Sequence, residues 1–449
     1  MSPQELQAIA DRVVAMAAPG EQVEAVVGWS RDTEVRAYDG EVEHFVSADS
    51  AGVGIRVISE GRQGLSWAGV LDDAALAECL AEARDNASFG SVDPDAGLAE
   101  PDGVDPVELR LYDERLLDVP TDEKIRLAIE MEALVRSGDS RISGVESADY
   151  ADSVSATAIA STTGIRSAGA ETSVYVGTYA LAADDHDTTT GFGFSVGRAV
   201  EDLDVRGAAD EAVERCVRLL GARKAASERL TVVLHPYVTS QFLGLVAEML
   251  SGEAVLRGRS PFAGRLGETV AAGALTVFDD ATDPLAPTAS DVDGEGLACR
   301  RVPLITDGVL QGYLHNAYTA RASGTRSTGS AQRGSPRSAP GVGPHVVSVV
   351  PGAQSLEQVL AQVGDGLLVH EIAGLHSGVN PVSGDLSVGA EGLRIRGGEL
   401  AEGVREVTIG STLQRMLGDV VAVGNDLTYF PWESVGVTLA IADVTMSGH

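Results

Sequence analysis

Short runs of alternating polar and apolar residues, separated by turn residues, recur along most of this 449-residue chain and limit what it can fold into. Residues 33–38 and 42–46 alternate in this way, and Asp39-Gly40 between them is a strong hairpin signal. Helical spacing marks fewer segments, among them residues 3–18 and residues 72–87. The pattern predicts an α+β fold whose N-terminal units combine helices with antiparallel sheets.

The order of helices, strands and linkers divides the chain into three predicted domains. A loose acidic stretch over residues 89–104 ends an N-terminal α+β domain of residues 1–104. Residues 105–226 are expected to form a middle domain with one antiparallel sheet, its strands over residues 143–159, 163–180 and 189–196. Residues 227–449 are expected to form a mainly β C-terminal body, either a barrel or a sandwich.

The charge balance and the lack of long apolar runs limit the expected partners. The 33 Lys and Arg residues face 66 Asp and Glu residues, which gives a formal net charge of −33. Because nucleic-acid binding depends on basic residues that displace counterions, we expect no nucleic-acid partner. No stretch approaches the ~18 apolar residues of a membrane-spanning helix, and the N-terminus lacks a signal-peptide pattern. We therefore expect no membrane contact and a cytoplasmic location.

His370, Glu371 and His376 are the residue types of a zinc hydrolase site, with imidazoles as ligands and a carboxylate as base. Their spacing suits no regular element, since six residues turn through ~600° on a helix and span about 20 Å on a strand. Only a reversal at Gly374 would bring both histidines to one ion. Metal binding by His370 and His376, with Glu371 as the catalytic group, remains an alternative to a structural or substrate-contacting role.

Residues 193–197 match the G-x-S-x-G pattern of a serine nucleophile. That motif requires a strand that leads directly into a helix, whereas residues 198–202 intervene before the next helical pattern. A glycine-rich strand packed closely against another backbone is the better interpretation of Ser195 and its neighbours.

A loop of small residues over 325–333 carries Arg326 and Arg333 in an otherwise acidic protein. Arginine forks suit carboxylates, so the loop could hold the C-terminus of a peptide or pair with the protein's own acidic residues. A mobile surface loop explains the same composition.

Several separated motifs resemble those of one known family. They are SGEAVLRGRSPFAGRLG over residues 251–267, DGEG over 293–296, STG in the loop that ends at Arg333, and HSGVNP followed by SGDLS within residues 376–387. With these motifs the chain resembles the TldD/PmbA modulators of DNA gyrase, a family of metallopeptidases, and within it the PmbA (TldE) branch. The resemblance begins near residues 61–64 and covers nearly the whole chain.

The resemblance implies a cytosolic heterodimer in which a TldD-type subunit carries zinc on a His-Glu-x-x-x-His helix. A PmbA-type subunit completes the substrate chamber, and the pair trims unfolded or ribosomally made peptides. Here the predicted helix over residues 236–250 stands where the zinc motif would, and it contains no histidine. We therefore expect no catalytic residue and no cofactor in this chain, and zinc in a TldD-like partner. The alternative is a self-sufficient metal-dependent hydrolase that uses the His370 site.

The resemblance also suggests which residues meet the peptide substrate. The expected chamber residues are His376, Asn380, Asp385 and Ser387, with Arg333 as a carboxylate contact. A purely structural Gly/Asn turn explains the composition of the same segment. Because strand edges in a large β body must be paired or covered, we expect a heterodimer or a homo-oligomer assembled through the C-terminal domain.

Overall fold

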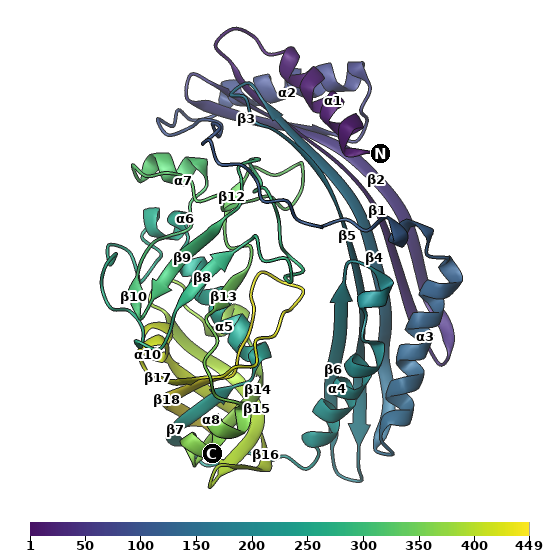
Figure 1. The fold of residues 1–449 in the computed structure, drawn as a ribbon, viewed down its shortest axis with the longest axis vertical. Coiled ribbons are helices and arrows are strands. Elements are labelled where there is room, and N and C mark those ends of the chain that lie inside the picture. Colours follow the sequence, from purple (N-terminus) through teal and green to yellow (C-terminus); the bar gives the residue numbers. More distant parts are fainter. Residues whose placement is uncertain (449) are drawn as a thin grey trace.

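An extended antiparallel sheet forms the N-terminal part of the molecule (Figure 1). The computed structural model describes residues 1–448 and has the mixed α+β architecture that the sequence predicts. Asp39 and Gly40 both have positive φ and form the predicted hairpin turn. The strand order is β3-β2-β1-β4-β5-β6, with β1 Gln22–Tyr38, β2 Glu41–Ser59, β3 Arg62–Ala68, β4 Ile142–Ser161, β5 Arg166–Ala183 and β6 Thr188–Gly197.

Helices cover the convex face of this sheet: α1 Pro3–Ala15, α2 Asp73–Phe89, α3 Thr121–Gly138 and α4 Val205–Arg218. Val23, Ala25 and Val27 of β1 are buried with α1 and α2, and Val35 and Ala37 are buried with α3 and α4. Because successive strand residues point to opposite faces, the even-numbered residues of the same strand face the concave side.

The first two predicted domains share this one sheet. β1 pairs with β4 from Glu24↔Ser161 to Ala37↔Ala148, so strands of residues 1–104 and of residues 105–226 are hydrogen-bonded neighbours. The pairing covers an edge of β1 that would otherwise be open to solvent. The sequence indicates both sets of strands, but the pairing between them joins segments more than a hundred residues apart.

Two glycines of β6 allow close contact with α4. A Cβ atom at Gly193 would lie 2.0 Å from the carbonyl oxygen of Ala208, and one at Gly191 would lie 2.4 Å from that of Ala212. No other residue fits there. This contact confirms the interpretation of residues 193–197 as a closely packed glycine-rich strand.

The C-terminal body contains a closed barrel, which confirms the barrel alternative. The expectation of assembly through the C-terminal domain rests on strand edges that need a partner. Closure of the barrel pairs those edges within this chain. Within the described residues, an unpaired strand edge lies instead in the N-terminal sheet, where β3 covers only residues 53–59 of β2. The barrel strands are β7 Glu228–Leu234, β14 Gly366–Ala373, β15 Asp385–Arg396, β16 Glu399–Thr412 and β18 Leu439–Ser447, with β16 paired to β18 and β17 Val420–Val423 alongside β18.

Shorter elements complete the C-terminal body. Helix α5 Pro236–Met249 shares its hydrophobic core with the barrel and with a small sheet of β8 Val277–Asp280, β9 Arg301–Thr306, β10 Val309–Leu310 and β13 Val347–Val349. The remaining elements are α6 Gly252–Leu256, α7 Ala317–Ala322, β11 Ala331–Gln332, β12 Gly341–Val342, α8 Leu356–Val363, α9 Leu375–Gly378 and α10 Leu413–Gly418.

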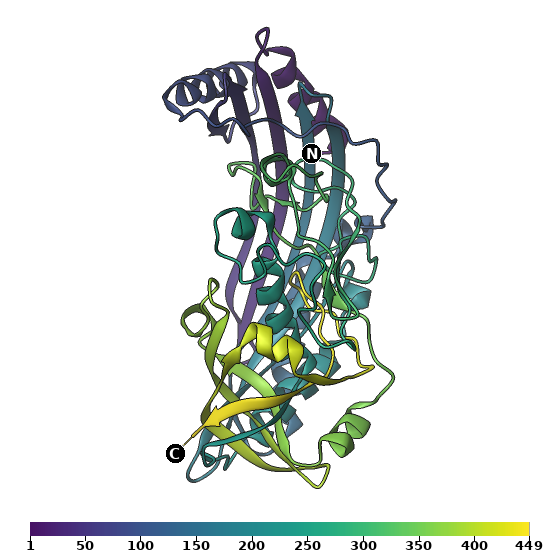
Figure 2. The same cartoon turned by 90° about the vertical axis from the view of Figure 1, so that its left-hand side faces the viewer.

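The C-terminal body lies on the concave side of the N-terminal sheet, as Figures 1 and 2 show. Near β6, aromatic rings form the contact: Phe192 lies 4.9 Å from Tyr237 between ring centroids, and Phe194 lies 5.8 Å from Trp432. Such tilted ring pairs add to the energy of apolar burial. They anchor one end of the body to the sheet.

A buried ion cluster forms a second contact between the sheet and the C-terminal body. Glu24 of β1 accepts hydrogen bonds from Arg56 of β2 at 2.9 Å and from Arg333 at 2.6 Å, and Arg56 lies 3.6 Å from Glu295. The side chains are 2%, 5%, 6% and 1% exposed, respectively. Burial opposes the ionisation of Glu24, but Arg56 and Arg333 outweigh it and lower its pKa. Arg333 therefore pairs with an acidic residue of its own chain.

Substitution of Glu24 should test how strongly this cluster joins the two parts of the molecule. Glu24→Ala leaves the guanidinium groups of Arg56 and Arg333 buried without this carboxylate, so we expect a loss of about 3–5 kcal/mol in the free energy of unfolding. Asp49→Ala breaks the exposed Arg31–Asp49 pair and should cost much less, because water screens that pair. Urea denaturation of both variants measures the difference. Equal, small losses would contradict the role of the cluster.

Candidate functional site

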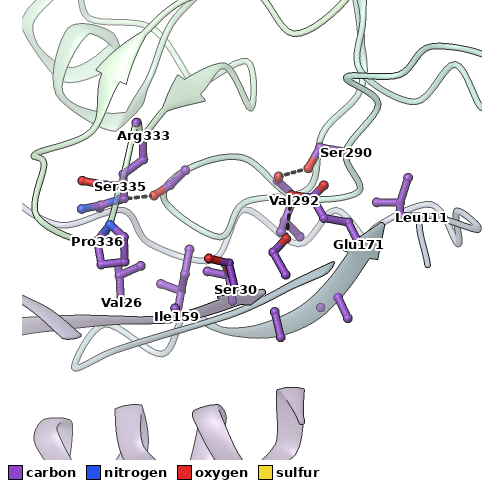
Figure 3. Close-up of a pocket in the computed structure, with 18 of the residues that line it drawn as sticks. Val26, Ser30, Leu111, Ile159, Glu171, Ser290, Val292, Arg333, Ser335 and Pro336 are labelled. Carbon is purple, nitrogen blue, oxygen red and sulfur yellow. Dashed lines mark hydrogen bonds between the residues drawn. The ribbon is translucent and has the colours of Figure 1, made fainter. Parts of the chain in front are cut away.

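A cavity of about 940 Å³ separates the concave face of the sheet from the C-terminal body (Figure 3). Strands β1, β2, β4 and β5 form its floor, and residues 287–294 and 331–337 form its roof. Arg333 and Pro336 line it near the ion cluster, and Glu433 lines it next to the aromatic contact. The ion cluster and the aromatic contact thus hold the roof above the floor and leave the space between them open.

Two rows of the floor consist of small and hydroxyl-bearing residues in register across the strands. Ser50, Ser30 and Ser155 occupy one row, and Gly52, Gly28 and Thr157 occupy the next. The Oγ atoms of Ser30 and Ser50 are 2.9 Å apart, within hydrogen-bond distance. The small side chains of these two rows let a ligand approach closely, and hydroxyls can both donate and accept hydrogen bonds.

The roof carries a buried histidine with an unused polar atom. His345 is 7% exposed, and its Nδ1 has no hydrogen-bond partner among the described residues. Burial lowers the pKa of His345 to about 4, so the ring is neutral at neutral pH. Its Nε2 lies 3.9 Å from Sγ of Cys299, whose pKa burial raises. The thiol is therefore not an activated nucleophile.

Arg198 lines the cavity without a carboxylate partner. Its guanidinium donates to the carbonyl oxygens of Leu111 at 3.1 Å, Thr172 at 3.3 Å and Pro287 at 3.2 Å. No carboxylate of the described residues lies within ion-pair distance of it. Burial lowers its pKa, against the more distant charges of Glu171 and Asp202. Arginine nevertheless stays protonated at neutral pH, so the positive charge of Arg198 lies among neutral acceptors.

The segment of residues 376–387 lies at the barrel, and its four expected chamber residues are exposed. Asn380 accepts hydrogen bonds at Oδ1 from the backbone N–H groups of Val382 at 2.9 Å and Ser383 at 3.2 Å, while Asp385 accepts one from the Ser383 hydroxyl. These contacts form a turn, as expected if the Gly/Asn composition of the segment has a structural role. The cavity contains Arg333 but none of His376, Asn380, Asp385 and Ser387, so the structure does not bring the five residues to one place.

His370 faces arginine and another histidine. An Nη1 atom of Arg218 lies 2.9 Å from its Nε2, and the ring of His235 lies 5.1 Å away between centroids. Burial, followed by the charges around it, lowers the pKa of His370 to about 2. Burial and the neighbouring Glu391 raise the pKa of Glu371. A guanidinium beside the imidazole repels a cation.

The His370 region therefore does not fit a zinc ion. Within residues 1–448, no three His, Cys, Asp or Glu side chains gather in a group that could hold a metal. His376 lies beyond the end of β14 on α9 and is exposed, as the reversal at Gly374 directs it. The same described residues include no helix long and apolar enough to cross a membrane.

Of the residues that line the cavity, the sequence predicted only Arg333 as a site residue. One signal for the floor was present, because Ser, Thr and Gly alternate with apolar residues in residues 27–30, 50–54 and 153–157. Such alternation indicates a strand with one face free of large side chains. Nothing in the sequence singles out Arg198 or His345.

Asp279 on β8 should make the stability of the roof depend on pH. It is 1% exposed and accepts hydrogen bonds at Oδ1 from the backbone N–H groups of His345 at 2.9 Å and Val346 at 2.6 Å. Burial raises its pKa to about 7 from a usual 3.8. Between pH 4 and pH 7 the folded state keeps this proton while the unfolded state has lost it. The free energy of unfolding therefore falls as the pH rises from about 4 to 7.

Asp279→Asn reproduces the protonated form and should remove that loss. Relative to wild type, its free energy of unfolding should gain about 2–3 kcal/mol between pH 5 and pH 8, at ~1.4 kcal/mol per pKa unit. Urea denaturation at both pH values measures the gain, with Asp49→Asn as an exposed control. A difference between variant and wild type that does not change with pH would contradict the raised pKa.

Comparison with known proteins agrees with this architecture over most of the chain. Three family models match: PmbA/TldA metallopeptidase domain 1 at residues 23–87, the central domain at 114–220 and the C-terminal domain at 227–448. The metalloprotease PmbA of Escherichia coli O157:H7 is 27% identical, covering 90% of this chain and 87% of that protein. A metalloprotease TldD homolog of Haemophilus influenzae is 26% identical, covering 86% and 82%.

Solved structures have the same fold. A Thermotoga maritima protein that carries the name modulator of a DNA gyrase superposes with a TM-score of 0.90 at 26% identity, covering 98% of this chain and 100% of that one. TldE from Thermococcus kodakarensis superposes with a TM-score of 0.89 at 23% identity, covering 99% of each chain. The resemblance in the sequence motifs is thereby confirmed, and the chain belongs to the PmbA/TldD family of metallopeptidases.

Proposed function

We propose that this chain is the TldE/PmbA-like subunit of a cytoplasmic metalloprotease complex that processes unfolded or ribosomally made peptides. In this proposal the chain has no zinc of its own, and a TldD-type subunit supplies the metal and the catalytic groups. The chain shapes the substrate chamber beside that zinc. Family membership supports the metalloprotease context.

The composition of helix α5 carries the proposal. The resemblance places the zinc motif on this helix, but Pro236–Met249 contains no histidine and Glu248 is its one carboxylate. His235 caps the helix, and its Nδ1 accepts a hydrogen bond from the backbone N–H of Tyr237. A catalytic zinc requires three protein ligands and an open position. A helix whose one potential zinc ligand is a single carboxylate suits a subunit that depends on a partner for its metal.

The exposed segment of residues 376–387 supports a role beside a partner. Its polar side chains lie outside the barrel and are accessible to a second chain or to a peptide. The turn contacts of Asn380 and Asp385 hold the segment in shape, while His376 is exposed on α9. Asn380 and Asp385 thus support the turn, and exposed His376 is available to contact a partner chain or a peptide.

Metal content tests the proposal directly. The purified chain should contain much less than one zinc per molecule and have little or no peptidase activity on an unfolded protein such as casein. Addition of a relative that carries a His-Glu-x-x-x-His helix should produce both zinc binding and activity. Near one equivalent of zinc in the chain alone, lost in His376→Ala, would instead support the self-sufficient hydrolase.

Substitutions in the exposed segment separate a chamber role from a structural one. In the complex, His376→Ala should lower peptidase activity several-fold while the melting temperature and subunit association stay unchanged, because the imidazole is exposed. Asn380→Ala serves as the control for structure, since it removes two turn hydrogen bonds and should lower the melting temperature. Normal turnover per folded complex in His376→Ala, with a large loss of stability, would leave only the structural turn.

A further inference from the structure

We propose that the cavity between the sheet and the C-terminal body binds a polypeptide segment, and that Arg198 receives its free C-terminal carboxylate. The inference rests on the proposed function in taking a peptide as the ligand. It adds a binding site within this chain, away from residues 376–387, and a preference for one end of the peptide.

The dimensions of the floor suit a short extended peptide. The cavity crosses the sheet from Trp67 on β3 to Thr172 on β5. Neighbouring strands are ~4.8 Å apart, so this path is about 19 Å long. An extended chain rises ~3.3 Å per residue, and about six residues would therefore fill the path.

The floor can hold a peptide without reading its side chains. Strands β1 and β4, in the middle of the floor, are hydrogen-bonded to a neighbouring strand on both sides, so a peptide lying across them cannot add as a further strand there. Serine and threonine hydroxyls remain available instead, and glycines in the neighbouring row let the peptide backbone lie close. Such a surface tolerates varied sequences.

Arg198 and Arg333 differ in what they can offer a carboxylate. Arg333 already donates to Glu24 inside the ion cluster. Arg198 uses three of its five N–H donors on backbone carbonyl oxygens and has no ion pair among the described residues. These carbonyls fix the guanidinium at the β5 end of the floor, where a carboxylate would supply the missing counter-charge.

The opposite end of the floor has a different character. The guanidinium carbon of Arg337 lies 3.6 Å from the ring centroid of Trp67, and Trp67 is half exposed. The stacked pair offers a flat apolar and cationic surface. It suits a peptide that continues out of the cavity, so the fixed carboxylate site is Arg198.

A matched pair of peptides tests the preference. The probes are an N-acetylated hexapeptide of Gly, Ala and Ser with a free C-terminal carboxylate and the same peptide as its C-terminal amide. Calorimetry with the full chain should find the acid bound about tenfold or more tightly than the amide, the effect of one charged hydrogen-bonded contact. Arg198→Gln should bind both peptides equally, at the level of the amide. Arg206→Gln, an equal charge change on exposed Arg206 of α4, should behave as wild type.

A second variant tests the floor separately from Arg198. Gly169 lines the cavity, and a Cβ atom built there meets no other atom within 4 Å. Gly169→Val should therefore fold normally, occupy the floor and weaken binding of both peptides. Gly144→Val, on β4 outside the cavity, is the matched control, because its Cβ meets only Leu181 at 3.7 Å.

Several outcomes would overturn the inference. They are equal binding of acid and amide by wild type, an equal loss of both in Arg198→Gln, unchanged binding in Gly169→Val, or no binding of either peptide at millimolar concentration. The last would identify a void between domains and nothing more. An active complex whose chain fails these peptide tests would retain the proposed function alone, whereas peptide binding without zinc-dependent activity in any complex would retain the site alone.

Discussion

The carboxylate of Glu24 between two arginines determines how the C-terminal body sits on the sheet. Charged groups this deeply buried are stable only with their partners in place, so Arg333 and Glu295 must lie at a fixed height above β1 and β2. Gly54 lies below the same loop, where a Cβ atom would be 1.6 Å from the carbonyl oxygen of Pro336. The position of the roof, and therefore the existence of the cavity, follows from these contacts.

The aromatic contact near β6 complements this polar one. Phe430 and Trp432 stack at 4.9 Å between centroids, and Arg215 of α4 lies 4.1 Å from the ring of Phe192. Apolar contacts tolerate small shifts, whereas buried ion pairs require defined geometry. The ion cluster therefore sets the register between the two parts, and the rings supply burial at the far end.

Local sequence signals predicted the fold well where neighbours in space are neighbours in the chain. The turn at Asp39-Gly40 and the glycine-rich strand around Gly193 depend on nearby residues and were predicted correctly. The β1–β4 pairing, closure of the barrel by β16 and β18, and the Arg333–Glu24 contact depend on distant segments. Strand patterns specify which face of a strand is buried but not which strand lies beside it. Arg333 could thus be recognised as a carboxylate ligand, but its partner could not be identified.

Helix α5 contains no histidine, and apolar residues hold it in the C-terminal body. Its buried residues Val238, Phe242, Val246 and Met249 follow helical spacing and belong to the core shared with the barrel. The helix is therefore held by apolar burial. The apolar residues that hold the helix in place are different from the polar residues that would bind a metal. Residues of the second kind can therefore change while the fold is kept. The same separation explains why family motifs identify the architecture of this chain more firmly than they identify its site.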